Sequence, residues 1–200
     1  SLAIGMNGNL VNAKDLRASL EQQGSIFQTN SDTEVLAHLI KRSRGALNQR
    51  ERVKKALSVL KGAFAFVLIT NDELMIAQDP NGLRPLSRGK IGDAWVAASE
   101  TCAFDIIGAE HVRSVEPGEL LIVDANGLHS ERFAERADRA ICSMEYVYFS
   151  RPDSNIDDIN VHNARKRCGI QLAKEVGDLE ADVVTGVPDS SISAAIGFSE

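Results

Sequence analysis

The chain has 200 residues, of which 44% are hydrophobic and 25% are charged, and its formal net charge at pH 7 is -6. This length suits one domain, or one domain and part of a second. The charged residues form no basic block, so we expect no nucleic-acid partner. No apolar run reaches the length of a membrane span, so we expect no membrane partner and a cytoplasmic location. The chain opens on Leu2 to Ile4, which reads as the end of a strand running into a polar turn at Met6 to Asn9. We therefore expect the N-terminus to be cut.

Three helices are predicted next. Residues 13–23 and 48–61 carry apolar side chains at helical spacing. Between them, Ser31 and Glu34 form a capping box, in which each side chain satisfies a backbone N–H near the start of a helix. This box places Asp32 in the first turn of the middle helix.

Three short apolar runs follow, at Ala63 to Ile69, Leu74 to Ala77 and Trp95 to Ala98. Each is bounded by turn residues, so we expect consecutive antiparallel strands that pair as a meander. The turn at Asp79 to Gly82 has the acid, proline and glycine positions of a rigid corner.

After the meander we expect a short helix at 100–107, a hairpin at 119–133 and a strand at Met144 to Phe149. A proline-containing break then ends at Ser154. We place the domain boundary here, which divides the chain into domains 1–154 and 155–200.

The second domain begins with a helix at 159–176 and a short strand at 181–185. The polar loop 186–191 then leads into another helix. This order is the opening of a parallel α/β unit. Because Glu200 comes before a third strand, we expect the second domain to be cut as well.

Two polar features near the N-terminus could carry chemistry. In Asn7-Gly8, the side-chain amide and an unshielded backbone N–H could both donate hydrogen bonds to one oxyanion, although most Asn-Gly pairs are plain turns. Asp32 lies at a helix N-terminus, which keeps a carboxylate charged and able to hold a substrate ammonium group. An acid chosen only to suit the helix dipole is the commoner alternative.

Two further features lie near the C-terminus. Asp189, Ser190 and Ser191 stand where a strand passes into a helix, a place at which free amides bind phosphate or diphosphate and hydroxyls can contact a metal. Ordinary N-capping is the alternative. Cys142 reads as a buried small side chain, unless three more cysteines converge on it to hold a cluster.

Together these stretches resemble a known family, amidophosphoribosyltransferase. It is the glutamine-dependent enzyme that begins purine synthesis, and the likeness is greatest to its bacterial branch with an iron-sulfur cluster. The resemblance covers essentially the whole chain in collinear order. The stretches that carry it include LKGAFAFVLI, DPNGLRPLSRG, ASETCAFDIIGA, VEPGELLIV, CSMEYVYFSRPDSNID, NVHNARKRCG and ADVVTGVPDSSISAAIGF.

The resemblance implies an α+β fold: an incomplete αββα N-terminal-nucleophile glutaminase sandwich, followed by the start of an α/β type I phosphoribosyltransferase domain. It implies that Asn7 and Gly8 stabilise the oxyanion and that Asp32 binds the α-ammonium group of glutamine. It further implies a homo-oligomer with Mg2+ and a 4Fe-4S cluster as cofactors. The implied C-terminal ligands are Asp189, Ser190 and Ser191 for phosphoribosyl diphosphate, Ser190 for magnesium and Cys142 for the cluster.

The chain also departs from the family pattern. The family's nucleophilic cysteine and the arginine that binds the glutamine carboxylate lie upstream of Ser1. Met6 stands where the family usually has histidine before Asn-Gly. The acidic phosphoribosyl-diphosphate loop and the other three cluster cysteines would lie downstream. We therefore expect the 200-residue chain by itself to catalyse neither half-reaction.

Two alternatives stay open. The first half could belong to another glutamine amidotransferase, such as glucosamine-phosphate synthase or asparagine synthetase. The segment from Arg151 onward argues against them, since those enzymes attach a different second domain. The chain could also be a non-catalytic fragment that keeps the fold.

Overall fold

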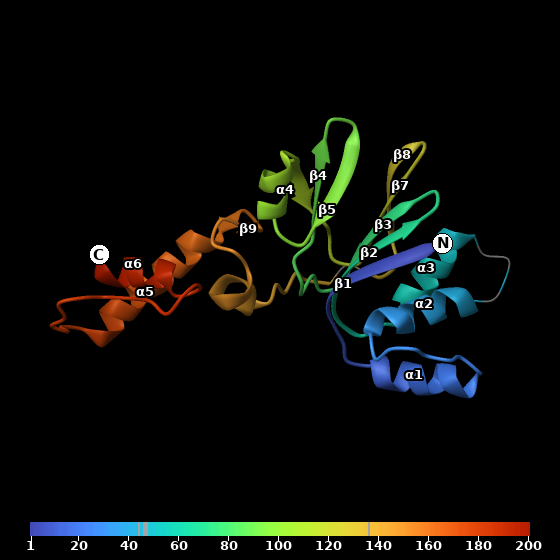
Figure 1. Ribbon diagram of the computed structural model, residues 1–200, viewed down its shortest axis with the longest axis horizontal. Coiled ribbons are helices and arrows are strands. Elements are labelled where there is room, and N and C mark those ends of the chain that lie inside the picture. The colour runs from blue at the N-terminus through green and yellow to red at the C-terminus, as the bar shows by residue number, and fades with distance from the viewer. Residues whose placement is uncertain (44, 46–47, 136) are drawn as a thin grey trace. The chain divides into compact units, whose positions relative to one another are not determined.

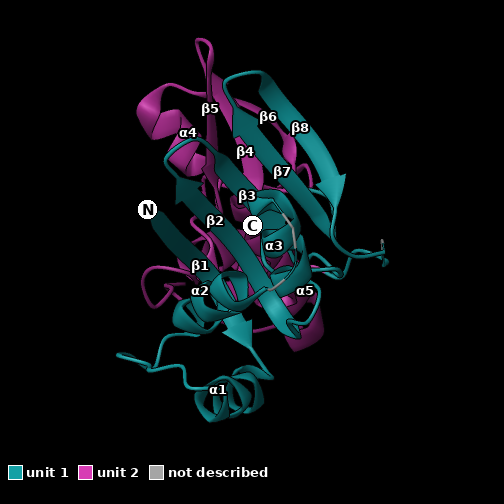
Figure 2. Ribbon diagram, turned by 90° about the vertical axis from the view of Figure 1, so that its right-hand side faces the viewer, with its two compact units in different colours: residues 1–86, 115–140 teal, residues 87–114, 141–200 magenta. Residues whose placement is uncertain are grey.

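The computed structural model describes residues 1–43, 45, 48–135 and 137–200. The chain forms two compact units: unit 1 holds residues 1–86 and 115–140, and unit 2 holds residues 87–114 and 141–200 (Figure 1, Figure 2). The predicted domain boundary after Ser154 rests on a proline-containing break in the sequence and not on spatial compactness, so it stays a prediction. Within the described ranges, no helix combines the length and the apolar character needed to cross a bilayer.

Unit 1 is built on one five-stranded antiparallel sheet with the strand order β1-β2-β3-β7-β8. The pairs β2-β3 and β7-β8 are hairpins, so the expected pairing of the first two apolar runs and the predicted hairpin at 119–133 are both confirmed. The strands are β1 (Leu2–Leu10), β2 (Gly62–Thr70), β3 (Leu74–Gln78), β7 (Glu119–Asp124) and β8 (Gly127–Arg132).

Strand β1 runs through Asn7 and Gly8 without a break, so the turn predicted at Met6 to Asn9 is wrong. Each residue of β1 has a partner in β2. Gly8 has a φ of +136°, and a Cβ at this position would lie 2.0 Å from the carbonyl oxygen of Ala63. Glycine is therefore required by the close approach of two strands, not by a chain reversal.

The described part of unit 1 also holds three helices. They are α1 (Ala13–Gln22), α2 (Asp32–Arg42) and α3 (Gln49–Leu57). Leu36 of α2 and Leu57 of α3 join Phe64, Phe66 and other apolar side chains of the sheet in one buried core. The alternation along β2 thus divides its side chains, since the even-numbered ones face the helices and the odd-numbered ones face the opposite side of the sheet.

The start of α2 differs in detail from the predicted capping box. Ser31 is the N-cap, but its Oγ accepts from Thr33 N and not from Glu34 N. The Glu34 carboxylate instead accepts from the N–H groups of Gln28 and Thr29, at 2.7 and 2.8 Å, and these hydrogen bonds lower its pKa. Glu34 therefore orders the loop before the helix, while the predicted helix start is confirmed.

Unit 2 contains a three-stranded antiparallel sheet, ordered β5-β4-β6, and a two-stranded ladder. The third run of the predicted meander, Trp95 to Ala98, pairs with β4 and not with β3, so that part of the prediction is wrong. The elements are β4 (Ser87–Ile91), β5 (Ala94–Ala98), α4 (Cys102–Ile107), β6 (Glu110–Ser114), the π-helix η1 (Glu145–Phe149), β9 (Asn155–Ile156), β10 (Ile159–Asn160), α5 (Val161–Val176) and α6 (Ile192–Ser199).

The strand predicted at Met144 to Phe149 is the π-helix η1. Arg165 of α5 explains the difference, because its guanidinium donates to the carbonyl oxygens of Tyr146 and Ser150, at 2.6 and 2.7 Å. These carbonyls therefore need no neighbouring strand. The burial of Arg165 lowers its pKa, since charge is costly to desolvate.

The strand predicted at 181–185 is also wrong: these residues form no strand in the structure. A parallel strand needs a neighbour to accept its hydrogen bonds, and the nearest strands in sequence, β9 and β10, pair with each other. The predicted helices on either side, α5 and α6, are confirmed.

Candidate functional site

The backbone N–H of Gly8 points to the outer edge of β1. Within a strand, successive N–H groups point alternately to the two sides. Val11 N–H donates across to Lys61 of the β2 side, at 2.9 Å, whereas Leu10 N–H donates to Asp32 on the other side. Gly8 has the same parity as Leu10, so its N–H faces outward. β1 ends the sheet order, so no described strand pairs with this edge.

Asp32 lies along the same edge. It is the first residue of α2, and its Oδ2 accepts from Leu10 N at 2.8 Å. Two residues of strand separate the N–H groups of Gly8 and Leu10, which is about 7 Å. The outer edge of β1 therefore offers the Gly8 N–H as a donor. Two residues further along the same edge, at Leu10, it holds the Asp32 carboxylate.

Asn7 presents its side chain on the sheet face opposite the helices, because it is paired with Ala65 and shares that residue's side. Its Oδ1 accepts from Arg84 Nε at 3.2 Å. Asn7, Gly8 and Asp32 thus lie on a single strand edge and the helix start beside it. Their roles in chemistry stay a prediction.

Met6 packs against the hydrophobic core, on the face opposite to Asn7. Its cross-strand partner is the buried Phe66. The residue that replaces the family's usual histidine therefore serves packing, and its thioether lies away from the face that carries the Asn7 amide.

The C-terminal candidates lie at the start of α6. Asp189 is exposed, whereas Ser190 and Ser191 are half-buried. Ser191 is the N-cap residue, and its Oγ donates to the carbonyl of Val187 without capping the helix. Ser190 and Ser191 border a hollow of about 250 Å³ that Tyr146, Tyr148 and Cys168 also line. Phosphate binding at this loop stays a prediction.

The described residues alone do not complete a metal or cluster site. No group of three or more histidine, cysteine or acidic side chains among them could hold a metal ion. The cysteines are unpaired: Cys102 is buried, Cys142 half-buried and Cys168 exposed. A 4Fe-4S cluster needs four cysteine ligands, and a single hydroxyl such as that of Ser190 does not make a magnesium site.

Residues 1–105 match the family described as a glutamine amidotransferase domain. The chain belongs to this family. Its match covers the strand that carries Asn7 and Gly8, the helix start at Asp32 and all of β2 and β3.

Close relatives extend the likeness to the whole chain. It is 65% identical over 200 residues to the amidophosphoribosyltransferase of Bacillus subtilis (strain 168), of which it covers 42%. It is 48% identical to that of Staphylococcus aureus (strain MRSA252), of which it covers 40%. Thus the chain spans less than half the length of these relatives. The resemblance found in the sequence is confirmed.

A solved structure gives the same result. The glutamine phosphoribosylpyrophosphate amidotransferase from B. subtilis, complexed with ADP and GMP, matches 99% of this chain with a TM-score of 0.95 and 65% identity, and the match covers 43% of that chain. The α+β fold class is therefore confirmed.

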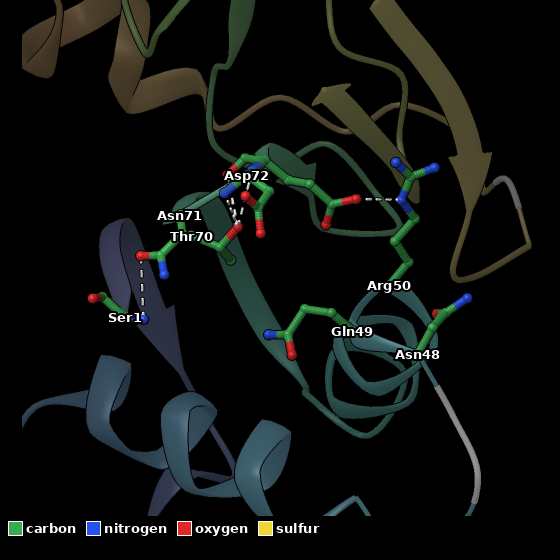
Figure 3. Close-up of a pocket in the computed structure, with 8 residues that line it drawn as sticks. Ser1, Asn48, Gln49, Arg50, Thr70, Asn71 and Asp72 are labelled. Carbon is green, nitrogen blue, oxygen red and sulfur yellow. Dashed lines mark hydrogen bonds and ion pairs between the residues drawn. The ribbon is translucent and has the colours of Figure 1, made fainter. Parts of the chain in front are cut away.

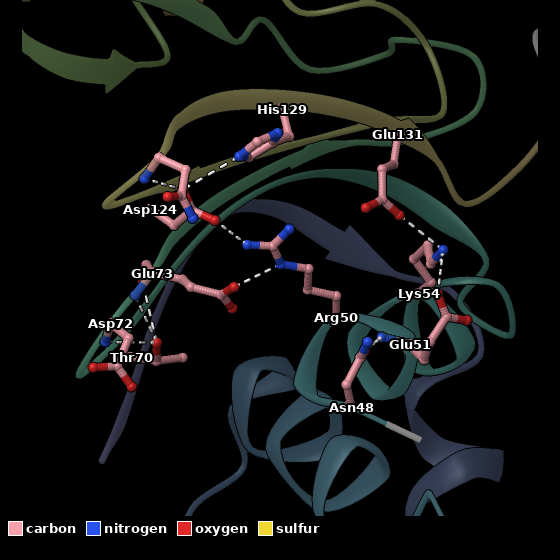
Figure 4. A network of polar contacts seen from close by, with 11 residues as sticks. Asn48, Arg50, Glu51, Lys54, Thr70, Asp72, Glu73, Asp124, His129 and Glu131 are labelled. Carbon is pink, nitrogen blue, oxygen red and sulfur yellow. Dashed lines mark hydrogen bonds and ion pairs between the residues drawn. The ribbon is translucent and has the colours of Figure 1, made fainter. Parts of the chain in front are cut away.

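A polar hollow at the far end of β1 was not predicted. It has a volume of about 510 Å³ and lies between the start of α3 and the β2-β3 turn (Figure 3). Arg50 on its wall is bound to Glu73 at 2.6 Å and also to Asp124, and these hydrogen bonds raise the pKa of Arg50. Figure 4 shows that this network ties α3 to β7 and β8. Its cation and acids satisfy one another, which indicates a structural role.

Proposed function

We propose that this chain is the glutamine-binding part of an amidophosphoribosyltransferase, the enzyme of the first committed step of de novo purine biosynthesis. The proposed overall reaction converts glutamine, phosphoribosyl diphosphate and water into 5-phosphoribosylamine, glutamate and diphosphate. The observation that carries this proposal is the shared edge of β1, where the N–H group of Gly8 lies about 7 Å from that of Leu10, which binds the Asp32 carboxylate. A glutamine side chain can bridge that separation.

In this proposal Asp32 receives the α-ammonium group of glutamine. Its Oδ2 is already engaged by Leu10, which fixes the carboxylate in place, and a carboxylate can accept further hydrogen bonds. The substrate amide then extends toward Gly8, whose N–H and the Asn7 amide donate to the carbonyl oxygen. Both donors gain strength as that oxygen becomes an anion.

The resemblance implies that the nucleophile is a cysteine upstream of this chain. Its thiolate forms a bond to the amide carbon, the C–N bond breaks, and the nitrogen leaves as ammonia after taking up a proton. Water then hydrolyses the thioester to glutamate and the free thiol. At a second site, ammonia bonds to C1 of phosphoribosyl diphosphate and diphosphate leaves.

The loop Asp189 to Ser191 is proposed to contribute to that second site, where amides at the start of α6 favour an anion. Magnesium bound with phosphoribosyl diphosphate, and a cluster ligated by Cys142, belong to the expectations from the resemblance. The described residues alone do not form either site. A cytoplasmic homo-oligomer completes the proposal.

The test is an assay of the full-length protein beside the 200-residue chain. The full-length protein is expected to form 5-phosphoribosylamine from glutamine and from ammonia, and the chain alone to hydrolyse no glutamine. Absence of both activities from a folded full-length protein would favour a non-catalytic role. Glutamine turnover by the chain alone would refute the assignment of the nucleophile to an upstream segment.

A further inference from the structure

The turn after β3 carries Arg84 to the side chain of Asn7. Arg84 Nε lies 3.2 Å from Asn7 Oδ1, although the two residues are 77 positions apart in sequence. A guanidinium has donors only, so the amide atom that faces it must be the carbonyl oxygen. The NH2 group of Asn7 is bonded to the same carbon and is therefore turned away from Arg84. This contact sets the carbonyl oxygen of the Asn7 amide toward Arg84.

Arg84 is itself held in place by buried polar side chains. Gln78 Nε2 donates to the Arg84 carbonyl oxygen at 2.7 Å, and Gln78 is fully buried. The buried carboxylate of Asp79 accepts from the N–H groups of Asn81 and Leu83, at 3.0 Å each. The turn is therefore held by its own buried side chains, and its arginine contacts β1, which lies two strands away from β3 in the sheet.

The sheet register explains why the arginine can reach. Asn7 is paired with Ala65, and Ala65 is paired with Gln78, so the three side chains form one row on one face. Arg84 is bound at both ends of this row, by Gln78 at its backbone and by Asn7 at its guanidinium. The distance between the ends is two strand spacings, about 10 Å. The small side chain of Ala65 stands between Asn7 and Gln78 in this row.

We propose that Arg84 is a positioning residue for glutamine hydrolysis, which orients the Asn7 amide so that its NH2 group, and not its oxygen, faces the oxyanion. This inference rests on the proposed function. A reversed amide would direct a carbonyl oxygen at developing negative charge, and that repulsion would raise the barrier. Orientation fixed in advance avoids a reorganisation cost during the reaction.

The experiment uses the full-length protein with Arg84→Met, which keeps the length of the side chain and removes its donors. We expect kcat with glutamine to fall about tenfold to a hundredfold, a part of the loss expected when an oxyanion donor is deleted, and KM for glutamine to change less than about threefold. Arg84→Lys keeps a cationic donor and should retain at least about threefold more activity than Arg84→Met. Ammonia-dependent activity reports whether each variant folds.

Two controls separate positioning from general packing. In an Asn7→Ala background, Arg84→Met should lower glutamine-dependent kcat no further, because the residue acts through Asn7. Arg132→Met removes another guanidinium of unit 1, one that donates to the Pro117 carbonyl, and should leave glutamine use unchanged.

The outcomes distinguish this inference from the function on which it rests. If Asn7→Ala alone leaves glutamine-dependent kcat unchanged, the proposed function of Asn7 fails and the inference fails with it. If Asn7→Ala lowers kcat but Arg84→Met does not, only the positioning role is overturned. The same conclusion follows if Arg84→Met lowers kcat equally with and without Asn7, or lowers the ammonia-dependent activity by the same factor.

Discussion

Asp32 Oδ2 accepts a hydrogen bond of 2.8 Å from the backbone N–H of Leu10. This bond joins the first turn of α2 to the outer edge of β1, three residues beyond Asn7. It places the acid for which the family resemblance implies substrate binding beside the strand that carries the predicted oxyanion donors. The same bond also stabilises the fold, so the two roles of Asp32 must be separated by experiment.

Asp32→Asn separates them. The asparagine oxygen can still accept from Leu10 N–H, so the free energy of unfolding should change by less than about 1 kcal/mol. The lost charge should raise KM for glutamine by at least about tenfold, because the substrate ammonium loses its charged partner. Steady-state kinetics of the full-length protein and urea unfolding measure the two effects. Asp32→Ala, which loses both interactions, is the comparison, and an unchanged KM in Asp32→Asn would contradict the substrate role.

Gly8→Ala should destabilise unit 1. The added Cβ would lie 2.0 Å from the Ala63 carbonyl oxygen, on a residue with φ of +136°. We expect the free energy of unfolding to fall by more than about 2 kcal/mol. Gly5→Ala in the same strand is the matched control, since the added Cβ would lie 3.9 Å from the Val67 carbonyl oxygen, an ordinary contact. Equal urea midpoints for the two variants would show that the stability of unit 1 does not require glycine at position 8.

The ion-pair network around Asp124 predicts a loss of stability in acid. A hydrogen bond from Asn126 N–H, and further ones from Arg50 and His129, lower the pKa of Asp124 from 3.8 to about 2. The unfolded state therefore binds this proton more readily, so the stabilisation is present above pH 3.8 and is lost as the pH falls toward 2. Urea midpoints measured through this range should fall less steeply for Asp124→Asn than for the natural protein. Asp93→Asn, in the exposed turn between β4 and β5, is the control and should keep the natural slope.

Local signals in the sequence identified most helices, and distant contacts explain the errors. Ser31 before Asp32 was enough to locate the start of α2, because a cap acts within one turn. Trp95 to Ala98 was correctly read as a strand, but its partner β4 depends on sheet pairing that local periodicity does not encode. Met144 to Phe149 alternates like a strand, yet Arg165 of a later helix donates to the carbonyl oxygens of Tyr146 and Ser150.

The candidate site shows the same difference between what local sequence signals predict and what distant contacts decide. The chemical types of Asn7, Gly8 and Asp32 pointed to an oxyanion and an ammonium group, and the family resemblance joined them. The sequence did not show that Gly8 N–H faces an open strand edge, since the Asn-Gly pair read as a turn. The contact of Arg84 with Asn7 was missed because it depends on the register of three strands, which local sequence patterns do not encode.

The most direct test of the glutamine site compares nitrogen sources for Asn7→Ala in the full-length protein. Loss of one oxyanion donor should lower kcat with glutamine about 100-fold to 1,000-fold. Formation of 5-phosphoribosylamine from free ammonia should stay near the natural rate, because that reaction does not use the β1 edge. A parallel fall in both activities, or full retention of glutamine use, would contradict the assignment of Asn7.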